Sequence, residues 1–180
     1  MSNKKKIKCC KDSFVTMTEM VLPNDTNTLN NMMGGRLMHL MDIASAIAAQ
    51  KHSNRIVVTA SADSISFSHP IALGDVVTFE AFVTRAFNSS MEVYVKVAAE
   101  NIPTGKKFVT NEAFFTFVAV DQSANPINVP ECQPETAKEQ ELYEGALRRR
   151  QLRLVLAKRI KPSDATELKS LFFGKEEAGK

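Results

Sequence analysis

The chain of 180 residues is long enough for one domain with a sizeable core and short tails. Hydrophobic residues make up 44% of it and charged residues 24%, and no apolar run approaches the roughly 18 residues that a membrane span requires. The formal net charge is only +3, and basic residues crowd both ends of the chain. No apolar segment follows the basic N-terminus, which excludes a secretory signal, so we expect a cytoplasmic protein.

The cysteine pattern excludes a metal framework. Cys9, Cys10 and Cys132 are odd in number and contain no CxxC pair. The adjacent Cys9 and Cys10 are poorly placed to bridge each other or to form a tetrahedral metal site. We therefore expect free thiols in a reducing compartment and no metal.

The first predicted elements are short. Residues 1–10 are predicted to be a disordered basic leader. Residues 12–21 alternate apolar and polar side chains, which predicts a strand. Residues 22–27 contain Pro23 and several Asx residues, which favour a turn-rich loop.

A long helix is predicted at about residues 36–51. Six apolar residues follow the i, i+3, i+4, i+7 spacing of a packed helical face: Leu37, Leu40, Met41, Ala44, Ile47 and Ala48. Further apolar residues extend around the cylinder, so we expect other structure to wrap the helix. The single charge in its middle is Asp42, and a buried carboxylate needs a partner or a chemical role. Gly34 and Gly35, just before the helix, present backbone N–H groups at the positive end of its dipole.

Four strands are predicted after the helix, at residues 56–67, 75–84, 91–100 and 108–120. Turn signals of hairpin length separate them, which indicates an antiparallel sheet. Pro126, Pro130 and Pro134 then break the pattern. A charged helix is predicted at about residues 135–160, a short helix after residues 163–166, and a disordered end at residues 174–180.

This order of elements predicts an α+β hot-dog fold, in which an antiparallel β-sheet wraps around a long central α-helix, with a C-terminal helical extension. The predicted boundaries are a leader at residues 1–10, a hot-dog domain at 11–125 and a helical extension and tail at 126–180. Fold class alone does not give function.

Most nucleophile motifs are absent from the sequence. It contains no GxSxG, HExxH or GxxxxGK[ST] pattern, and the spacing of His39, His52 and His69 favours structural roles. Asp42 and Asn31 form the informative pair. Asp42 is either a carboxylate satisfied by hydroxyl or amide groups or a reactive group, and Asn31 is either a turn residue or a substrate contact.

Several motifs carry a family resemblance over residues 12–125. They are Pro23-Asn24-Asp25-Thr26-Asn27, Asn31, Gly34-Gly35, Met41-Asp42, Pro70-Ile71, Gly74-Asp75, Ser89-Ser90-Met91-Glu92-Val93, Ala99-Glu100-Asn101, Thr104-Gly105 and Phe115-Thr116-Phe117-Val118-Ala119-Val120-Asp121. Together they resemble the signature of the hot-dog acyl-CoA thioesterases of the acyl-CoA hydrolase type. The resemblance implies hydrolysis of fatty acyl-CoA to a free fatty acid and coenzyme A (CoA).

The resemblance also implies a site shared by two subunits, with Asn31 of one facing Asp42 of the other. Asp42 would deprotonate the attacking water, or alternatively attack as a nucleophile to give a mixed anhydride. Asn31 would position the water or the thioester carbonyl. The backbone N–H of Gly35 would stabilise the oxyanion.

Coenzyme A would enter as part of substrate and product, with no separate cofactor. Candidate substrate-binding residues are Gly34, Thr59, Arg85, Asn88, Ser89, Ser90, Arg148 and Arg150. The basic residues among them would meet the CoA phosphates. We expect a homo-oligomer, at minimum a dimer and by resemblance a trimer of dimers (a homohexamer), with no nucleic-acid or membrane partner.

Two alternatives stay open. An acyl-CoA-binding regulatory module without turnover would call for an attached DNA-binding domain, which a leader of eleven residues is too short to form. A hot-dog dehydratase or hydratase would need a catalytic histidine ahead of the helix, where the sequence has none.

Overall fold

The computed structural model describes residues 6–63 and 65–173. The chain divides into two compact units, Met1–Gln133 and Pro134–Lys180, which we call the hot-dog unit and the C-terminal unit. The predicted leader falls partly, and the predicted disordered end at 174–180 wholly, outside the described residues.

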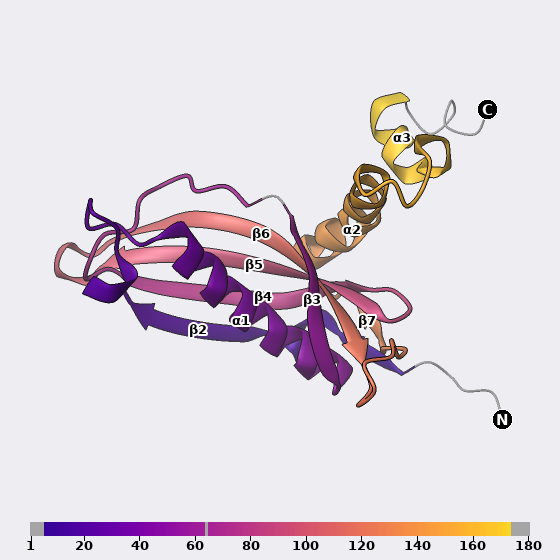
Figure 1. Cartoon of the computed structure of the whole chain (residues 1–180), viewed down its shortest axis with the longest axis horizontal. Helices are drawn as coiled ribbons and strands as arrows, with labels where there is room; N and C mark the ends of the chain where they lie inside the picture. The colour runs from indigo at the N-terminus through magenta and orange to yellow at the C-terminus, as the bar shows by residue number, and fades with distance from the viewer. Residues whose placement is uncertain (1–5, 64, 174–180) are drawn as a thin grey trace. The chain divides into compact units, whose positions relative to one another are not determined.

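The hot-dog unit contains, within the described residues, an antiparallel sheet of five strands in the order β2-β4-β5-β6-β3 (Figure 1). Its strands are β2 (Val15–Met20), β3 (Ile56–Asp63), β4 (Val76–Ala86), β5 (Ser90–Asn101) and β6 (Lys106–Val120). Alternating side chains produce this arrangement because successive residues of a strand point to opposite faces. The predicted hot-dog class and the predicted order of its elements are confirmed. The strand that begins at Ile56 is shorter than expected and ends at Asp63.

The core lies between the sheet and α1 (Gly34–Ser53), which runs along one face of the strands (Figure 1). The sheet contributes buried residues from three strands: Val77, Phe79, Ala81 and Val83, then Met91, Val93, Val95 and Val97, then Phe115 and Phe117. Leu37, Leu40, Met41, Ala44 and Ala48 of α1 pack in the same cluster. This apolar burial is the main driving force for the fold.

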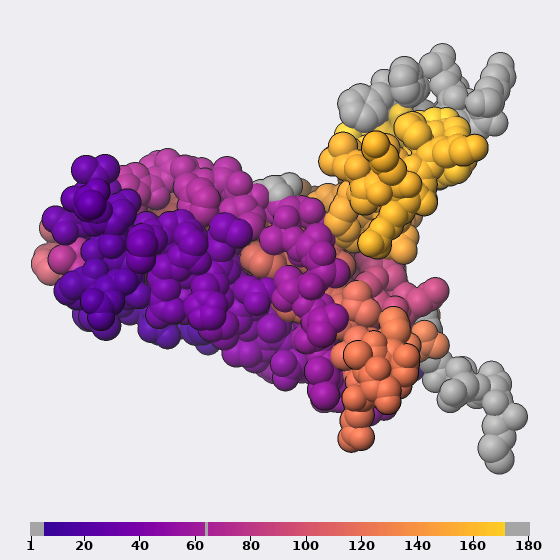
Figure 2. Space-filling view, viewed as in Figure 1, coloured from indigo at the N-terminus to yellow at the C-terminus, as the bar shows by residue number. Residues whose placement is uncertain are grey.

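The opposite face of α1 is not covered by the sheet. Met38 is 39% exposed and Ile47 is 41% exposed, although both extend the apolar surface of the helix. The space-filling view looks onto the side of the molecule on which α1 lies (Figure 2). The all-round wrapping expected from the apolar sequence is therefore wrong for a single chain, because one sheet layer can cover only one side of a helix.

A small parallel ribbon adds structure that the sequence pattern did not predict. β1 (Ile7–Cys9) pairs with β7 (Glu131–Gln133), and the 3₁₀ turn η1 (Cys10–Ser13) follows β1. Residues 7–10 thus belong to the ordered unit and not to a disordered leader. The ammonium of Lys8 anchors β1 by donating to the carbonyl of Lys51 and to Oδ1 of Asn54, each at 2.7 Å.

The C-terminal unit is helical, as predicted. It contains α2 (Ala137–Leu156), the short 3₁₀ turn η4 (Pro162–Asp164) and α3 (Thr166–Phe173). Thr136 and Glu139 form a capping box that satisfies N–H groups at the start of α2. In the described part of the chain, no helix is both long and apolar enough to cross a membrane.

Candidate active site

The loop before α1 is fixed to the first turn of the helix by Asp25. The Arg36 Nε donates to Oδ1 of Asp25 at 2.8 Å, and the Met33 N–H donates to the Asp25 carbonyl at 2.8 Å. Asp25 belongs to the 3₁₀ turn η2 (Pro23–Asp25), which the proline helps to start because its φ is already suitable. The loop therefore has a defined position relative to the helix N-terminus.

Asn27 and Asn31 close this loop on each other. Oδ1 of Asn27 accepts from the N–H groups of Leu29 and Asn31, at 2.9 and 3.2 Å. The Asn27 N–H donates to the Asn31 carbonyl at 2.8 Å, and Asn31 forms a bridge with Ala72. Both asparagines are thereby held beside the start of α1. Asn27, which stands in the motif but had no role assigned from the sequence, is brought to the same place as Asn31.

A cavity of about 390 Å³ opens beside this loop. Its lining comes from the loop, from the first turn of α1 and from the segment before β4: Asn27, Asn31, Met32, Gly34, Leu37, Phe67, His69, Pro70 and Ile71. No side chain caps the N-terminus of α1, where Met33 is the N-cap residue, so within the described residues its first N–H groups lack a side-chain partner. Such a terminus favours negative charge.

The two glycines at the helix start have different surroundings. A Cβ at Gly34 would lie 3.1 Å from Cζ of Phe67, so glycine allows the aromatic ring to approach the helix closely. A Cβ at Gly35 would meet nothing within 4 Å. Gly35 is exposed, so its backbone is accessible from outside the chain's own fold.

Asp42 lies two turns further along α1 and pairs with Thr59 of β3. The Thr59 hydroxyl donates to Oδ1 of Asp42 at 2.8 Å. Thr59 pairs with the buried Phe117 across the ladder, so its side chain faces α1. A register shift follows directly between Thr59 and Ser61, and such bulges redirect side chains near functional sites.

One chain does not bring Asp42 into the cavity of the two asparagines. Asp42 is absent from the cavity lining, and it follows Gly34 by eight residues. At 1.5 Å per residue this places it about 12 Å along the helix. One chain therefore has two separate clusters of candidate residues: Asn31 and Gly34 line the cavity together with Asn27, and Asp42 pairs with Thr59.

The expected CoA-binding residues lie elsewhere. Asn88 and Ser89 belong to the β4–β5 connection, and Ser90 begins β5, at the end of the sheet where β6 finishes. The guanidinium of Arg85 lies over the ring of Phe87, 5.8 Å from its centroid. Arg148 and Arg150 are on α2 in the C-terminal unit.

The histidines have three separate environments. His52 is fully buried at the end of α1, where its Nε2–H donates to the Pro130 carbonyl at 3.0 Å, and burial lowers its pKa. His39 is exposed. His69 packs edge-on against Phe108 at 5.7 Å and lines the cavity, although it follows α1 in the sequence. Chain order alone could not reveal that placement, because the segment before β4 folds back to the helix start.

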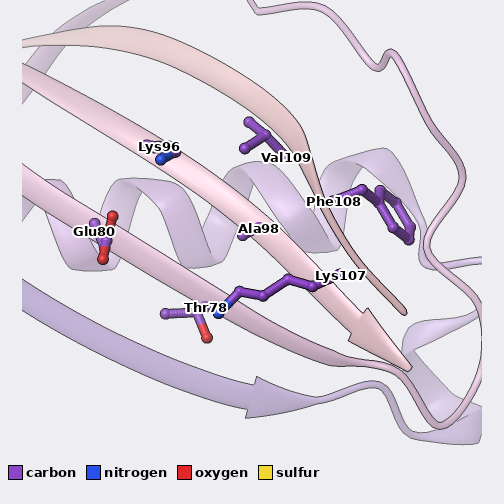
Figure 3. Close-up of a pocket in the computed structure, with 7 residues that line it drawn as sticks. All are labelled: Thr78, Glu80, Lys96, Ala98, Lys107, Phe108 and Val109. Carbon is purple, nitrogen blue, oxygen red and sulfur yellow. The ribbon is translucent and has the colours of Figure 1, made fainter. Parts of the chain in front are cut away.

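A second cavity, of about 380 Å³, lies on the outer face of the sheet (Figure 3). Its lining residues come from β4, β5 and β6: Thr78, Glu80, Lys96, Ala98, Lys107, Phe108 and Val109. Thr78 and Glu80 alternate with the buried Val77 and Phe79, so this cavity faces away from α1. None of the expected catalytic or substrate-binding residues lines it, and we do not assign the reaction to it.

Comparisons with known proteins show which family the chain resembles. The model of the thioesterase superfamily matches residues 29–106. An uncharacterised acyl-CoA thioester hydrolase of Bacillus subtilis, YkhA, is 44% identical over 140 residues, which cover 78% of this chain and 81% of the relative.

Solved structures match over most of the chain. A hexameric acyl-CoA thioesterase in the apo form superposes with a TM-score of 0.82 at 41% identity, covering 84% of this chain and 97% of its own. An acyl-CoA hydrolase from Staphylococcus aureus, in complex with butyryl-CoA, CoA and CoA disulfide, has a TM-score of 0.78 at 36% identity and covers 85% and 95%.

Three structures of the S. aureus hydrolase carry a single alanine substitution, with TM-scores of 0.80, 0.79 and 0.77. The residues replaced are an asparagine, an aspartate that lies 15 positions later and a threonine that lies a further 17 positions on. The fold, the glycine-started helix and the extent of these matches lead to one conclusion. The chain belongs to the hot-dog acyl-CoA thioesterase family.

Proposed function

We propose that the protein hydrolyses fatty acyl-CoA thioesters to a free fatty acid and CoA, with Asp42 as the general base. The observation that carries this proposal is the hydrogen bond from Thr59 to Oδ1 of Asp42, the single acidic residue of α1. This carboxylate is half-buried in the middle of the helix, and the hydroxyl of Thr59 fixes its orientation. Among the described residues Oδ2 has no protein hydrogen-bond partner, and in the proposal it accepts a proton from the attacking water.

The reaction needs little more than a base and oxyanion stabilisation, because a thioester is already activated. Asp42 deprotonates the water, whose oxygen attacks the thioester carbonyl carbon. The backbone N–H of Gly35 donates to the carbonyl oxygen as it becomes negative, at the positive end of the α1 dipole. Collapse of the intermediate breaks the C–S bond and releases the CoA thiolate. Direct attack by Asp42 is the alternative route and would give a mixed anhydride.

Asparagine supplies the polar group that orients the water or the thioester. Asn27 and Asn31 both line the cavity beside the helix start. The spacing of the substituted residues in the S. aureus hydrolase supports Asn27, because Asn27, Asp42 and Thr59 have the same separations of 15 and 17 positions. We therefore propose Asn27 as the orienting residue. Asn31, the candidate from the sequence, is tested in the same assay.

We propose that the complete site forms between two copies of the chain. Within one chain, Asp42 lies about 12 Å along α1 from Gly34 and does not line the cavity. Two features offer an interface for a second copy: the apolar outward face of α1, and the edge strand β3, on which Ile56 and Val58 are 59% and 49% exposed. The hexameric state of the neighbouring thioesterase supports a trimer of dimers. A cytoplasmic location stays a prediction of the sequence.

CoA binding is proposed for Arg85, Asn88, Ser89 and Ser90 in the hot-dog unit and, as a separate candidate, for Arg148 and Arg150 of α2. The test is a variant with Arg148, Arg149 and Arg150 all changed to Gln. If one of them holds a phosphate, the KM for acyl-CoA should rise about tenfold, since about 1.4 kcal/mol of lost binding is one decade. An acyl-pantetheine substrate lacks the nucleotide phosphates and should be hydrolysed equally by variant and wild type. Equal losses on both substrates would exclude a phosphate contact.

A second candidate, a hydratase, is favoured by one observation only: His69 lines the same cavity as the helix start. The two reactions differ in their products. A thioesterase releases free thiol from a saturated acyl-CoA, whereas a hydratase consumes the double bond of an enoyl-CoA and releases no thiol.

The experiment for the proposal is a thiol-release assay across acyl chain lengths, with wild type, Asp42→Asn, Asn27→Ala and Asn31→Ala. Asp42→Asn keeps the side-chain shape and should fold, yet lose at least about a hundredfold in turnover, the scale of a lost general base. Hydrolysis at the wild-type rate by folded Asp42→Asn would exclude Asp42 as base. The chain lengths with the highest kcat/KM define the substrate.

A further inference from the structure

Two cysteines that are distant in the sequence meet in the core of the hot-dog unit. The Sγ atoms of Cys10 and Cys132 are 3.1 Å apart, although 122 positions separate the residues. Cys10 is fully buried and Cys132 is 6% exposed. Neither forms a disulfide in the structure. The Cys132 thiol donates to the Val83 carbonyl at 3.3 Å, which leaves the Cys10 S–H as the donor in the contact between the sulfurs.

Backbone structure on both sides holds this pair in place. Cys132 is the middle residue of β7, paired with Lys8 of β1, and Cys10 begins η1 directly after β1. The Cys9 N–H donates to Oδ2 of Asp12 at 3.0 Å, and the Ser13 hydroxyl donates to the Cys10 carbonyl at 2.7 Å. The meeting of the sulfurs therefore follows from the β1–β7 ribbon and its turn.

We propose that Cys10 and Cys132 are a dithiol that closes to a disulfide under oxidation. A disulfide has an S–S distance of about 2.05 Å, so the two sulfurs must approach by only about 1 Å. A metal is the other use of paired thiols, but no group of three or more His, Cys, Asp or Glu residues suited to a metal occurs in the described part of the chain. The inference does not depend on the proposed hydrolysis.

The oxidant is a small disulfide such as oxidised glutathione, which reaches the buried thiols when the three-residue ribbon of β1 and β7 opens locally. One cysteine, as its thiolate, attacks a glutathione sulfur, forms a mixed disulfide and expels one glutathione thiolate. The second cysteine thiolate then attacks the protein sulfur of the mixed disulfide and expels the other glutathione. The two protons lost by the protein are taken up by the leaving thiolates. Two protein thiols are thus oxidised to one disulfide while one glutathione disulfide is reduced to two thiols.

The disulfide would covalently link the β1 and β7 segments, which both contact the C-terminal end of α1. On the β1 side, Lys8 donates to the carbonyl of Lys51 in the last turn of the helix, at 2.7 Å. On the β7 side, the buried His52 donates to the Pro130 carbonyl at 3.0 Å. A disulfide also closes a loop of 122 positions in the unfolded chain and lowers its entropy. The oxidised protein should therefore unfold at a higher temperature than the reduced protein.

The experiment compares full-length wild type with Cys9→Ser, Cys10→Ser and Cys132→Ser after incubation with oxidised or reduced glutathione. Trypsin releases Cys9 and Cys10 together in the peptide 9–11 and Cys132 in the peptide 108–138. Mass spectrometry should find these two peptides joined in oxidised wild type and in Cys9→Ser, with the loss of two hydrogen atoms, and not in the other two variants. The melting temperature should rise by roughly 5–10 °C on oxidation in the same two proteins only.

Cys9→Ser is the matched control because it changes the neighbouring thiol and leaves the pair intact. Cys10→Ala and Cys132→Val repeat the test with apolar residues in case a buried serine impairs folding. A cross-link that survives in Cys10→Ser, or that disappears in Cys9→Ser, would assign the bond to Cys9 and overturn the proposal. Absence of the cross-link in oxidised wild type would overturn it as well.

Discussion

The hydrogen bond between Thr59 and Asp42 can be removed almost without changing shape. Thr59→Val replaces the hydroxyl by a methyl group on the same β-branched skeleton, so β3 should keep its pairing with β6. The variant loses the donor that lies 2.8 Å from Oδ1 of Asp42. The carboxylate can then rotate away from the orientation in which it receives a proton from water.

The size of the effect follows from the character of this bond. A hydrogen bond to a charged group contributes about 1.5–3 kcal/mol, and we take the lower end because Asp42 is half-buried and Thr59 is exposed in the single chain. If that orientation is needed in the transition state, kcat should fall about tenfold, since about 1.4 kcal/mol equals one decade. KM should change little because Thr59 acts through Asp42. Steady-state thiol release at saturating acyl-CoA measures both.

Thr59→Ser is the control, because it keeps a hydroxyl and loses only the methyl group. It should retain most of the wild-type kcat. A folded Thr59→Val with wild-type kcat would refute the positioning role. A loss of kcat in Thr59→Ser without a loss in Thr59→Val would show that the methyl packing, and not the hydrogen bond, carries the effect.

Three further changes test the surroundings of the site. Arg36→Gln removes the ion pair with Asp25, which contributes less than about 1 kcal/mol at this partly exposed position, so the melting temperature should barely change. The turnover number kcat should fall, because the loop that carries Asn27 and Asn31 loses a contact to α1. Gly35→Ala should fold as well as wild type, since a Cβ there meets nothing within 4 Å. It should lose turnover if the thioester approaches this backbone, and an unchanged kcat would exclude Gly35 from the site. The pKa of His52 is lowered from 6.5, chiefly by burial, so below pH 6.5 the unfolded chain binds more protons at this residue than the folded chain. The free energy of unfolding should consequently fall as the pH drops below 6.5, and urea titrations of His52→Gln should show a smaller fall.

The order of the large elements could be predicted because each has a periodic signal. Strands β4 and β5 alternate inward and outward side chains over 11 and 12 positions, and β6 is a run of 15 residues rich in aromatic and β-branched side chains. Hairpin-length turns between these strands favour antiparallel neighbours. The helix was found from its apolar spacing. These are local patterns, and the short connections set only the order β4-β5-β6. The pairing of β2 with β4 and of β3 with β6 joins strands that are not consecutive in the chain.

The missed features depend on contacts between distant residues. β1 and β7 have three residues each, too few for a periodic pattern, and Lys8 anchors β1 by reaching the end of α1. The exposed face of α1 was expected to be covered by the rest of the chain. An apolar residue in a sequence indicates burial, but it does not show whether the same chain or another surface covers it. His69 reaches the cavity only because the segment before β4 folds back.

In the candidate site too, local signals could be predicted and tertiary contacts could not. Asp42 stands out in the sequence as an isolated charge, and its partner Thr59 was among the candidate residues, but their contact is a tertiary feature. Asn27 and Asn31 have nearly identical local signals in one turn-rich loop, so composition could not separate them. Their shared cavity and the spacing relative to Asp42 provide the further information.

Subunit complementation tests the split site most directly. Asn27→Ala and Asp42→Asn are each expected to lose about a hundredfold in turnover when assayed alone. The two variants are then mixed, and a second mixture combines Asn31→Ala with Asp42→Asn. In an exchanged equal mixture, half of the dimers contain both variants and have one intact site, so about a quarter of the wild-type turnover per chain should return. Native mass spectrometry of differently tagged chains verifies the exchange. Full exchange without any return of activity in either mixture would contradict a site built from two subunits.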